Sequence, residues 1–440
     1  MSLLDLFPDT AQVNSRGHLS IGGCDLVDLA AEAGTPLYIF DEATLRQRCR
    51  SFVTEFGQRH PQTTVAYACK AFINRGLAAI FREEGLGLDV VSGGELAIAH
   101  AVEFPLETVY FHGNNKSAQE LELALDWSIG RVVVDNFHEL ALLQELARAR
   151  GRVQDILLRL SPGIDPHTHQ HTTTGIVDSK FGFTMITGQA ETALAQALAA
   201  SHLRLIGLHC HLGSPIFEME PYRQAIEVVL DFAARMRAKY GFQPAEISPG
   251  GGFAVTYTTD SPAPPIAEYA ETIVSALRKG YQGSSLPRLV VEPGRAIVAQ
   301  AGVALYRVGA TKDIPGVRCY VSVDGGMSDN IRPAIYGARY QAAIANRMEE
   351  SVSDSTLRKV TLAGKFCESG DILIRDIELP PLSAGDLVAV PVSGAYCLAM
   401  ASNYNASLKP AVVLVNEGMA TLIRRRETYD DLMRCDVGGH

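Results

Sequence analysis

The chain has 440 residues, of which 47% are hydrophobic and 20% are charged, and its formal net charge is −10. This length predicts two domains with buried cores, and the acidic balance disfavours nucleic acid and anionic membrane surfaces as partners. No apolar stretch is long enough to cross a bilayer, and the N-terminus lacks the basic and apolar regions of a signal peptide. Together with eight cysteines that form no CxxC pair, these features predict a cytoplasmic protein with reduced thiols.

Residues 1–34 predict one or two short strands, and residues 35–40 predict a strand that leads into the next region. From there, eight short apolar runs each stop at a polar or glycine-rich step and precede a helix-like segment. The runs cover residues 65–68, 88–91, 109–111, 132–134, 156–158, 205–208, 247 and 289–291. Strands that alternate with amphipathic helices are typical of parallel βα units, and eight such units predict a TIM-type (β/α)8 barrel over residues 37–295.

Helix signals lie between these runs. Residues 136–151 give the clearest one, because Asn136 is a favourable N-cap, apolar residues recur at helical spacing, and Gly151 lies just past the end. The same pattern predicts helices over residues 221–240 and 266–281.

Beyond Arg295 the pattern changes to short β-rich runs. They cover residues 304–308, 318–323, 360–362, 386–392 and 411–422, and the last run contains a hairpin turn at 416–418. One helix is expected over residues 338–346. We predict a separate β-sandwich or β-barrel domain formed by residues 296–440 together with the N-terminal strands in residues 1–36.

The residue that follows the first run is Lys70. Active sites of barrels of this kind lie at the C-terminal ends of the strands. Partial burial at such a strand end favours a neutral, nucleophilic amine. An ordinary surface lysine, with its charge in water, is the alternative.

A glycine triplet follows the seventh run, and an arginine follows the eighth. Gly250, Gly251 and Gly252 can bring backbone N–H groups close to an anion, and the loops after strands seven and eight are the usual phosphate site of this fold. Arg295 and the hydroxyl of Ser214 can pair with the same anion. Together with Lys70, these residues predict a site for a phosphorylated aldehyde cofactor.

Glu292 and a histidine pair end two further runs. Glu292 could keep a pyridine nitrogen protonated, which makes the ring a strong electron sink, or it could form a salt bridge with Arg295. His209 and His211 could bind a metal ion, or His211 could stack on a flat cofactor ring. The sequence offers no third and fourth metal ligand at a convincing spacing, so we favour stacking and expect no metal.

A last group of reactive residues lies in the predicted β domain. Cys367 stands beside Glu368 in a glycine-rich loop, where a role as proton donor competes with that of an ordinary buried cysteine. Tyr396 belongs to a second polar stretch that ends at Asn405.

Ten motifs occur in a fixed order along the chain. They are YACKA (67–71), DVVSGGEL (89–96), HGNNKS (112–117), DSKFG (178–182), HCHLGS (209–214), GGGF (250–253), EPGR (292–295), DNIRPAIY (329–336), CESGD (367–371) and GAYCLAMASNYN (394–405). In this order the chain resembles, essentially from end to end, the fold-type III pyridoxal-phosphate-dependent decarboxylases. It departs from a common family pattern at Lys365, Cys397 and Ala399.

The resemblance implies pyridoxal 5'-phosphate as the cofactor and a role for each matching residue. Lys70 would bind the cofactor aldehyde covalently, and Cys367 would protonate the substrate carbon after CO₂ leaves. The cofactor would be bound by Lys70, Asp89, His211, Ser214, Gly250, Gly251, Gly252, Glu292, Gly294, Arg295 and Tyr396. The substrate would be held by Arg295, Arg332, Tyr336, Glu368 and Tyr396. A homodimer with shared active sites is also implied.

The resemblance also implies a substrate and a reaction, which are the decarboxylation of meso-2,6-diaminopimelate at its D-centre to L-lysine in the last step of lysine biosynthesis. The distal end of this substrate carries both an ammonium and a carboxylate, and a carboxylate suits the fork of an arginine such as Arg332. Arg332 could instead form a structural ion pair at the interface. The alternatives are a decarboxylase of ornithine, lysine or a related amino acid, an amino-acid racemase, a non-catalytic cofactor carrier and a metallohydrolase.

Overall fold

The computed structural model describes residues 1–165, 174–175, 178–348 and 357–438. The chain divides into two compact units. The barrel unit comprises Arg48–Ala254 and Ala263–Ala296, and the sheet unit comprises Met1–Gln47, Val255–Pro262 and Ile297–His440. None of the helices in the described ranges is both long enough and apolar enough to cross a membrane.

The barrel unit is a closed barrel of parallel strands. They are β5 (Thr63–Ala68), β6 (Gly87–Val90), β7 (Val109–Phe111), β8 (Arg131–Val134), β9 (Gln154–Ser161), β11 (Leu203–Cys210), β12 (Glu246–Gly250) and β13 (Arg288–Val291). Seven of the eight predicted runs lie within these strands, and the run 88–91 extends one residue past the end of β6. Pairing of β13 with β5 and of β8 with β9 closes the ring, so the predicted (β/α)8 class is confirmed.

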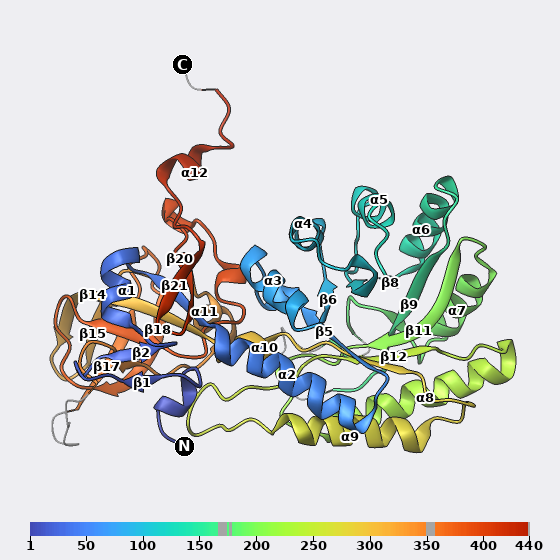
Figure 1. Cartoon of the computed structure of the whole chain (residues 1–440), viewed down its shortest axis with the longest axis horizontal. Coiled ribbons are helices and arrows are strands. Elements are labelled where there is room, and N and C mark those ends of the chain that lie inside the picture. The colour runs from blue at the N-terminus through green and yellow to red at the C-terminus, as the bar shows by residue number, and fades with distance from the viewer. Residues whose placement is uncertain (166–173, 176–177, 349–356, 439–440) are drawn as a thin grey trace. The chain divides into compact units, whose positions relative to one another are not determined.

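Helices surround the barrel strands (Figure 1). They are α2 (Glu42–Arg59), α3 (Arg75–Glu83), α4 (Gly93–Ala101), α5 (Ala118–Asp126), α6 (Phe137–Ala149), α7 (Gln189–Ala199), α8 (Glu220–Tyr240) and α9 (Ile266–Gly280). The side chains of Asn74, Ser92, Ser117 and Asn136 accept backbone N–H bonds at the starts of four of them. Each of these capping residues follows a strand within a few residues, so the local sequence determines where the helix begins after the strand. The three helices predicted from periodicity are confirmed as α6, α8 and α9.

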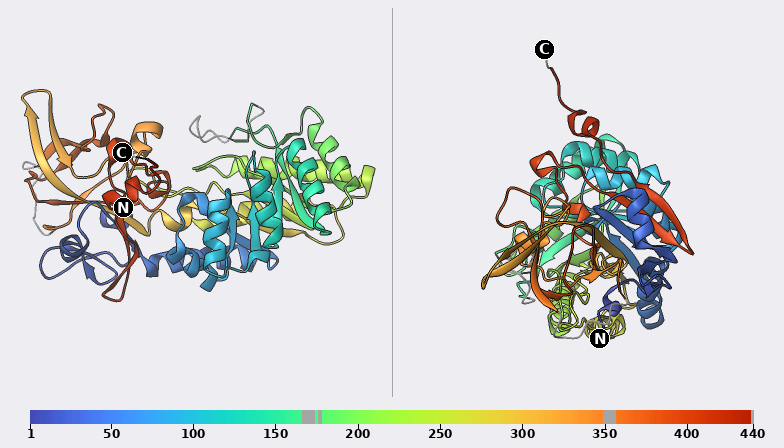
Figure 2. Two further views of the ribbon diagram at one scale, coloured as in Figure 1. Left: turned by 90° about the horizontal axis from the view of Figure 1, so that it is seen from above. Right: turned by 90° about the vertical axis from the view of Figure 1, so that its left-hand side faces the viewer.

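The sheet unit contains two sheets. One has the order β18-β17-β15-β14-β4-β20-β21, with β19 paired to β14 and β16 paired to β19, and the other is β1-β2-β3. The strands are β1 (Gln12–Val13), β2 (Leu19–Ile21), β3 (Cys24–Asp25), β4 (Leu37–Asp41), β14 (Gly302–Ile314), β15 (Arg318–Val323), β16 (Ala343–Ile344), β17 (Arg358–Ala363), β18 (Ile372–Leu379), β19 (Leu387–Val390), β20 (Ala411–Asn416) and β21 (Met419–Arg424). Figure 2 shows blue N-terminal segments beside red C-terminal strands, in agreement with the pairing of β4 with β20.

Some sequence expectations for this unit were wrong. The strand expected to lead into the barrel is β4, and it pairs instead with β14 and β20 of the sheet unit, where its five residues are all buried. Residues 338–346 form no helix. The short helix there is α11 (Arg332–Tyr336), which Gly337 ends at φ +60°, and β16 follows it. Strand β18 and helix α1 (Leu26–Ala33) were not predicted, whereas the hairpin between β20 and β21 was.

A buried ion pair between Lys116 and Glu139 holds two loops together at the C-terminal end of the barrel. The Lys116 amine donates to the Glu139 carboxylate at 2.7 Å and to the carbonyl oxygens of Gly113 and Val133 at 2.8 and 2.9 Å. The second Glu139 oxygen accepts the N–H of Asp135 at 3.0 Å. Burial lowers the pKa of Lys116 and raises that of Glu139, so each charge depends on its partner. The pair connects the loop after β7 to the start of α6.

Lys116→Met should lower the free energy of unfolding by about 3–5 kcal/mol, because it leaves the Glu139 charge buried without its partner. Urea denaturation measures this loss. Adding Glu139→Gln should recover much of it. Arg148→Met on α6, which breaks an exposed pair with Glu145, is the control and should cost less than about 1 kcal/mol. Equal losses for Lys116→Met and Arg148→Met would contradict this role of the buried pair.

Candidate active site

The C-terminal rim of the barrel gathers the predicted cofactor residues. Lys70 lies in a short 3-10 turn, Cys69–Ala71, directly after β5, and its amine is 3.9 Å from a carboxylate oxygen of Asp89 on β6. Burial raises the pKa of Asp89 to about 8, against the opposing effect of the Lys70 charge. The Lys70 amine therefore lies beside a carboxyl group that can gain or lose a proton near neutral pH.

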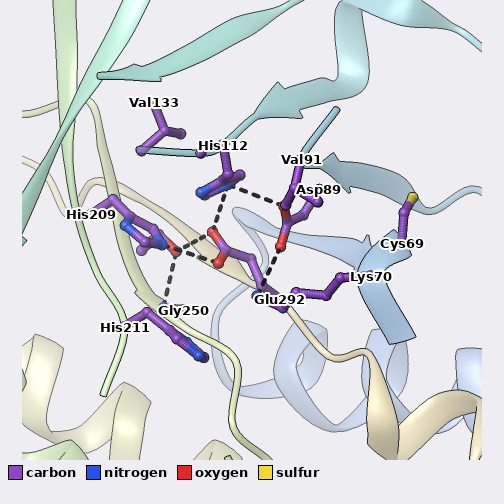
Figure 3. A network of polar contacts seen from close by, with 12 residues as sticks. Cys69, Lys70, Asp89, Val91, His112, Val133, His209, His211, Gly250 and Glu292 are labelled. Carbon is purple, nitrogen blue, oxygen red and sulfur yellow. Dashed lines mark hydrogen bonds and ion pairs between the residues drawn. The ribbon is translucent and has the colours of Figure 1, made fainter. Parts of the chain in front are cut away.

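Glu292, directly after β13, is the most highly connected acid of the rim (Figure 3). One of its oxygens contacts Nε2 of His209 at 3.0 Å, and the other accepts the hydroxyl of Ser248 at 2.8 Å. Nε2 of His112 lies 3.5 Å from the carboxylate. Burial alone would raise the pKa of Glu292, but His209 and His112 bring it below its ordinary value. The group is therefore a carboxylate at neutral pH, inside the protein.

Several buried polar atoms of this rim have no hydrogen-bond partner in the described part of the chain. They are Oδ1 of Asp89, Nε2 of His112 and Nδ1 of His209. Burial lowers the pKa of His209, so its ring is neutral, and the N–H at Nε2 faces Glu292. Unsatisfied buried groups of this density indicate that the rim is built to receive a polar ligand.

The glycine triplet crosses the rim with almost no free space around its α-carbons. Gly250 and Gly252 have φ values of +78° and +105°, which disfavour other residues. A Cβ on Gly251 would lie 2.1 Å from the backbone oxygen of Glu292. The N–H of Gly251 donates to Nδ1 of His211 at 3.2 Å, and burial lowers the pKa of that ring. His211 is therefore a neutral, oriented imidazole beside the glycine loop.

The remaining barrel residues of the prediction also lie at this rim. Nε of Arg295 donates to the Ser214 hydroxyl at 3.2 Å, which joins the ends of two strand-to-helix loops. Gly294 leaves room for the turn after β5, because a Cβ there would lie 3.0 Å from Ala68. The residues suited to a phosphorylated aldehyde are thus gathered in one unit: an amine, an anion cradle, a neutral imidazole and a buried carboxylate.

A possible metal-ligand set occurs in the same place. Ligand atoms of His112, His209 and Glu292 lie within 4.8 Å of one another. Sequence reasoning considered His209 with His211 and missed this set, because His112 is remote in the chain. The expected absence of a metal stays a prediction.

The predicted substrate residues lie in the sheet unit. Arg332 is buried, its guanidinium lies 4.5 Å from the ring centre of Tyr257, and it donates to the hydroxyl of Tyr340. Within the described ranges, no carboxylate lies within 4.0 Å of Arg332, and an ion pair at an interface with a second copy of the chain stays the alternative prediction. Tyr257 and Tyr340 were missed by sequence reasoning, since neither belongs to a recognisable motif. The Tyr340 hydroxyl also lies 3.5 Å from the sulfur of Cys397, one of the positions that departs from the family pattern.

Tyr336 and Tyr396 occupy nearby backbone turns of the same unit. Tyr336 lies one helical turn after Arg332 and directs its hydroxyl to the sulfur of Met400 at 3.9 Å. Tyr396 adopts a left-handed conformation with φ +61°. Non-glycine residues with positive φ are strained and are frequent at functional sites.

Cys367 and Glu368 are exposed. Cys367 lines a cavity of about 800 Å³ within the sheet unit, together with Lys365, Asp324, Asn405 and Arg426. The N–H of Cys367 donates to the side-chain oxygen of Asn405 at 3.3 Å. An exposed thiol in an open cavity is available to a ligand or to another chain.

Comparisons with known proteins agree with this chemistry. The family described as "Pyridoxal-dependent decarboxylase, pyridoxal binding domain" matches residues 42–299. Diaminopimelate decarboxylase of Bacillus subtilis is 48% identical over 430 residues, which cover 97% of each chain, and that of Synechocystis is 44% identical over 443 residues, which cover 98% of this chain and 93% of the relative.

Solved structures give the same result. A crystal structure of diaminopimelate decarboxylase from M. jannaschii superposes with a TM-score of 0.91 at 34% identity and covers 98% of both chains. A second structure of that enzyme, in complex with L-lysine, gives a TM-score of 0.90 at 33% identity and covers 98% of both chains. The chain therefore belongs to the pyridoxal-dependent decarboxylases and, within them, to the diaminopimelate decarboxylase family.

Proposed function

We propose that this protein decarboxylates meso-2,6-diaminopimelate at its D-centre to give L-lysine and CO₂, with pyridoxal 5'-phosphate as cofactor. The observation that carries this proposal is the rim of the barrel, where Lys70, Asp89 and Glu292 lie together in a chain of this family. The cofactor supplies the electron sink that takes up the electron pair left by CO₂.

The barrel residues hold and tune the cofactor. Lys70 would hold the cofactor through its aldehyde, and Asp89, 3.9 Å away, could take the proton that the amine must lose. Glu292 is kept anionic and oriented by His209 and Ser248, so it can hold a proton on the pyridine nitrogen. His211, oriented by the N–H of Gly251, would stack on the ring.

The phosphate is surrounded by backbone amides and by one cation. Gly250, Gly251, Gly252 and Ser214 would line its site, Arg295 would supply the charge, and Tyr396 is expected near it. Arg295 already contacts Ser214 at 3.2 Å, so the two donors converge on one point.

The sheet unit recognises the distal end of the substrate. Arg332 keeps a buried guanidinium between tyrosine rings and without a described carboxylate partner, which suits a substrate carboxylate. Arg295, Tyr336 and Tyr396 hold the substrate with it, and Glu368 suits the distal ammonium. Ornithine and lysine lack this carboxylate, so the argument favours diaminopimelate.

Cys367 delivers the proton that replaces CO₂. Its exposure fits an active site that is shared between two copies of the chain, in which Cys367 and Glu368 of one protomer serve the barrel of its partner. We therefore propose a homodimer in the cytoplasm.

Lys70→Ala should abolish turnover of meso-diaminopimelate, because no other amine at the rim can replace the covalent attachment. CO₂ release by the purified variant, supplied with excess cofactor, measures this. Lys180→Ala, a lysine that stacks on Phe181, is the control and should keep activity. Substantial activity of Lys70→Ala would refute the assignment.

Glu292→Gln should lower kcat on the order of 10²-fold, because the group that keeps the ring nitrogen protonated loses its charge. Cofactor content, measured by absorbance after release in alkali, should stay unchanged. The matched control is Glu246→Gln, a buried glutamate at the start of β12 that pairs with Arg131, and it should affect stability more than kcat. Similar kcat values for wild type and Glu292→Gln would contradict this role of Glu292.

Arg332→Met should lower kcat/KM for meso-diaminopimelate by about 10- to 150-fold, the range expected for one lost hydrogen-bonded charge pair. Most of the change should be in KM, with cofactor content constant. Arg339→Met removes an exposed arginine that pairs with Asp260, and it should leave the kinetics unchanged. An unchanged KM in Arg332→Met would show that another group holds the distal carboxylate.

A further inference from the structure

Two loops of the sheet unit contain or precede the proposed substrate residues. The arginine loop, residues 325–331, leads into α11 and Arg332. The cysteine loop, residues 364–371, contains Cys367 and Glu368. They are separate in sequence, and the side chain of Asp371 joins them.

The carboxylate of Asp371 accepts one backbone N–H from each loop. One oxygen accepts from Met327 of the arginine loop at 2.7 Å, and the other accepts from Phe366 of the cysteine loop at 2.9 Å. The residue is only 3% exposed. Burial raises the pKa of Asp371, while these two donors oppose the shift. A buried carboxylate with one donor from each loop fixes the distance between their backbones.

Glycines on both sides allow this close approach. A Cβ on Gly326 would lie 2.5 Å from one Asp371 oxygen, and a Cβ on Gly364 would lie 2.1 Å from the other. The N–H of Lys365 also donates to the carbonyl of Gly325 at 3.2 Å. The two loops are therefore in direct backbone contact around the carboxylate.

The arginine loop has a rigid base on its other side. Both oxygens of Asp329 are engaged: one accepts from the N–H of Gly326 at 2.9 Å, and the other accepts from the hydroxyls of Tyr38 and Tyr306 at 3.0 and 2.5 Å. These tyrosines lie on strands β4 and β14. The sheet thus fixes the position of the arginine loop. The hydrogen bonds of Asp371 then fix the cysteine loop relative to the arginine loop.

The reactive end of the cysteine loop is bonded mainly within the loop itself, where the N–H of Asp371 donates to the carbonyl of Glu368 at 3.0 Å. Cys367 and Glu368 are exposed, and the N–H of Cys367 makes a 3.3 Å bond to Asn405. We propose that Asp371 is a positioning residue that holds the loop of Cys367 and Glu368 at a fixed spacing from the loop that leads to Arg332. The kinetic part of this proposal rests on the proposed function, and the contact between the loops does not.

Asp371→Asn tests the proposal in the full-length holoenzyme. The amide keeps the shape of the carboxylate but has one acceptor oxygen, so one of the two N–H groups faces a donor. Hydrogen–deuterium exchange followed by mass spectrometry should show faster exchange in peptides from both loops, by about ten-fold, the factor expected for one lost buried hydrogen bond. With meso-diaminopimelate, kcat should fall about ten-fold at unchanged cofactor content.

Asp386→Asn is the matched control. Asp386 is a buried aspartate of the same unit that bonds Arg347 and the N–H of Ser383, and it contacts neither loop. Its substitution should lower stability while exchange in the two loops and kcat stay as in wild type. Equal kinetic loss in both variants would overturn the proposal, because a general loosening of the unit would then explain it.

Gly364→Ala provides a second variant if Asp371→Asn does not fold, because its methyl group displaces the same carboxylate without removing it. Faster exchange in both loops supports the proposal, and faster exchange in one loop or neither overturns it. Unchanged kcat with faster exchange overturns the positioning role. A wild-type protein that releases no CO₂ from meso-diaminopimelate would refute the proposed function, and the exchange data would still decide whether Asp371 couples the loops.

Discussion

The site depends on one constraint: eight parallel strands that close into a ring bring all their C-terminal ends to a single rim. Polar residues that are far apart in the chain are therefore buried together, and their charged and polar groups require hydrogen-bond or ion-pair partners. Glu292 shows the result. Its carboxylate meets Ser248 from β12, His209 from β11 and His112 from the end of β7. A charge that would be costly alone is stabilised by hydrogen bonds with Ser248 and His209 and by the nearby ring of His112.

Crowding at the same rim explains the choice of residues in the glycine loop. The backbone of β12 passes so close to Glu292 and to Gly213 that a methyl group on Gly251 or Gly252 would overlap carbonyl oxygens. The loop is thus specified first by packing. The backbone N–H groups of this buried loop would suit a phosphate, because glycine allows the close approach that such binding needs. Tight packing and the binding of an anion would both require glycine at residues 251 and 252.

Features carried by local sequence were predictable. The strands, the N-caps and the polar step after each strand are local, so the barrel and the position of Lys70 at its rim followed from periodicity and spacing. The placement of β4 was not predictable, because its apolar residues suit a barrel strand and a sheet strand equally, and its partners are more than 250 residues away. Residues 338–346 look helical, but Gly337 ends α11 and the following segment pairs as β16. The contacts of Arg332 with Tyr257 and Tyr340 depend on folding of the whole unit.

The environment of Arg332 explains how such a residue can remain buried. A guanidinium removed from water is costly unless other groups replace the lost hydration. The faces of Tyr257 and Tyr340 and the Tyr340 hydroxyl provide part of that replacement, but no described carboxylate provides the rest. Aromatic faces stabilise the cation without occupying its planar fork of donors. The arrangement holds the arginine side chain in place and gives it no carboxylate partner among the described residues. A ligand carboxylate would therefore lose little conformational entropy in ordering this side chain. It would also meet a cation that is already desolvated, so its binding free energy would benefit twice.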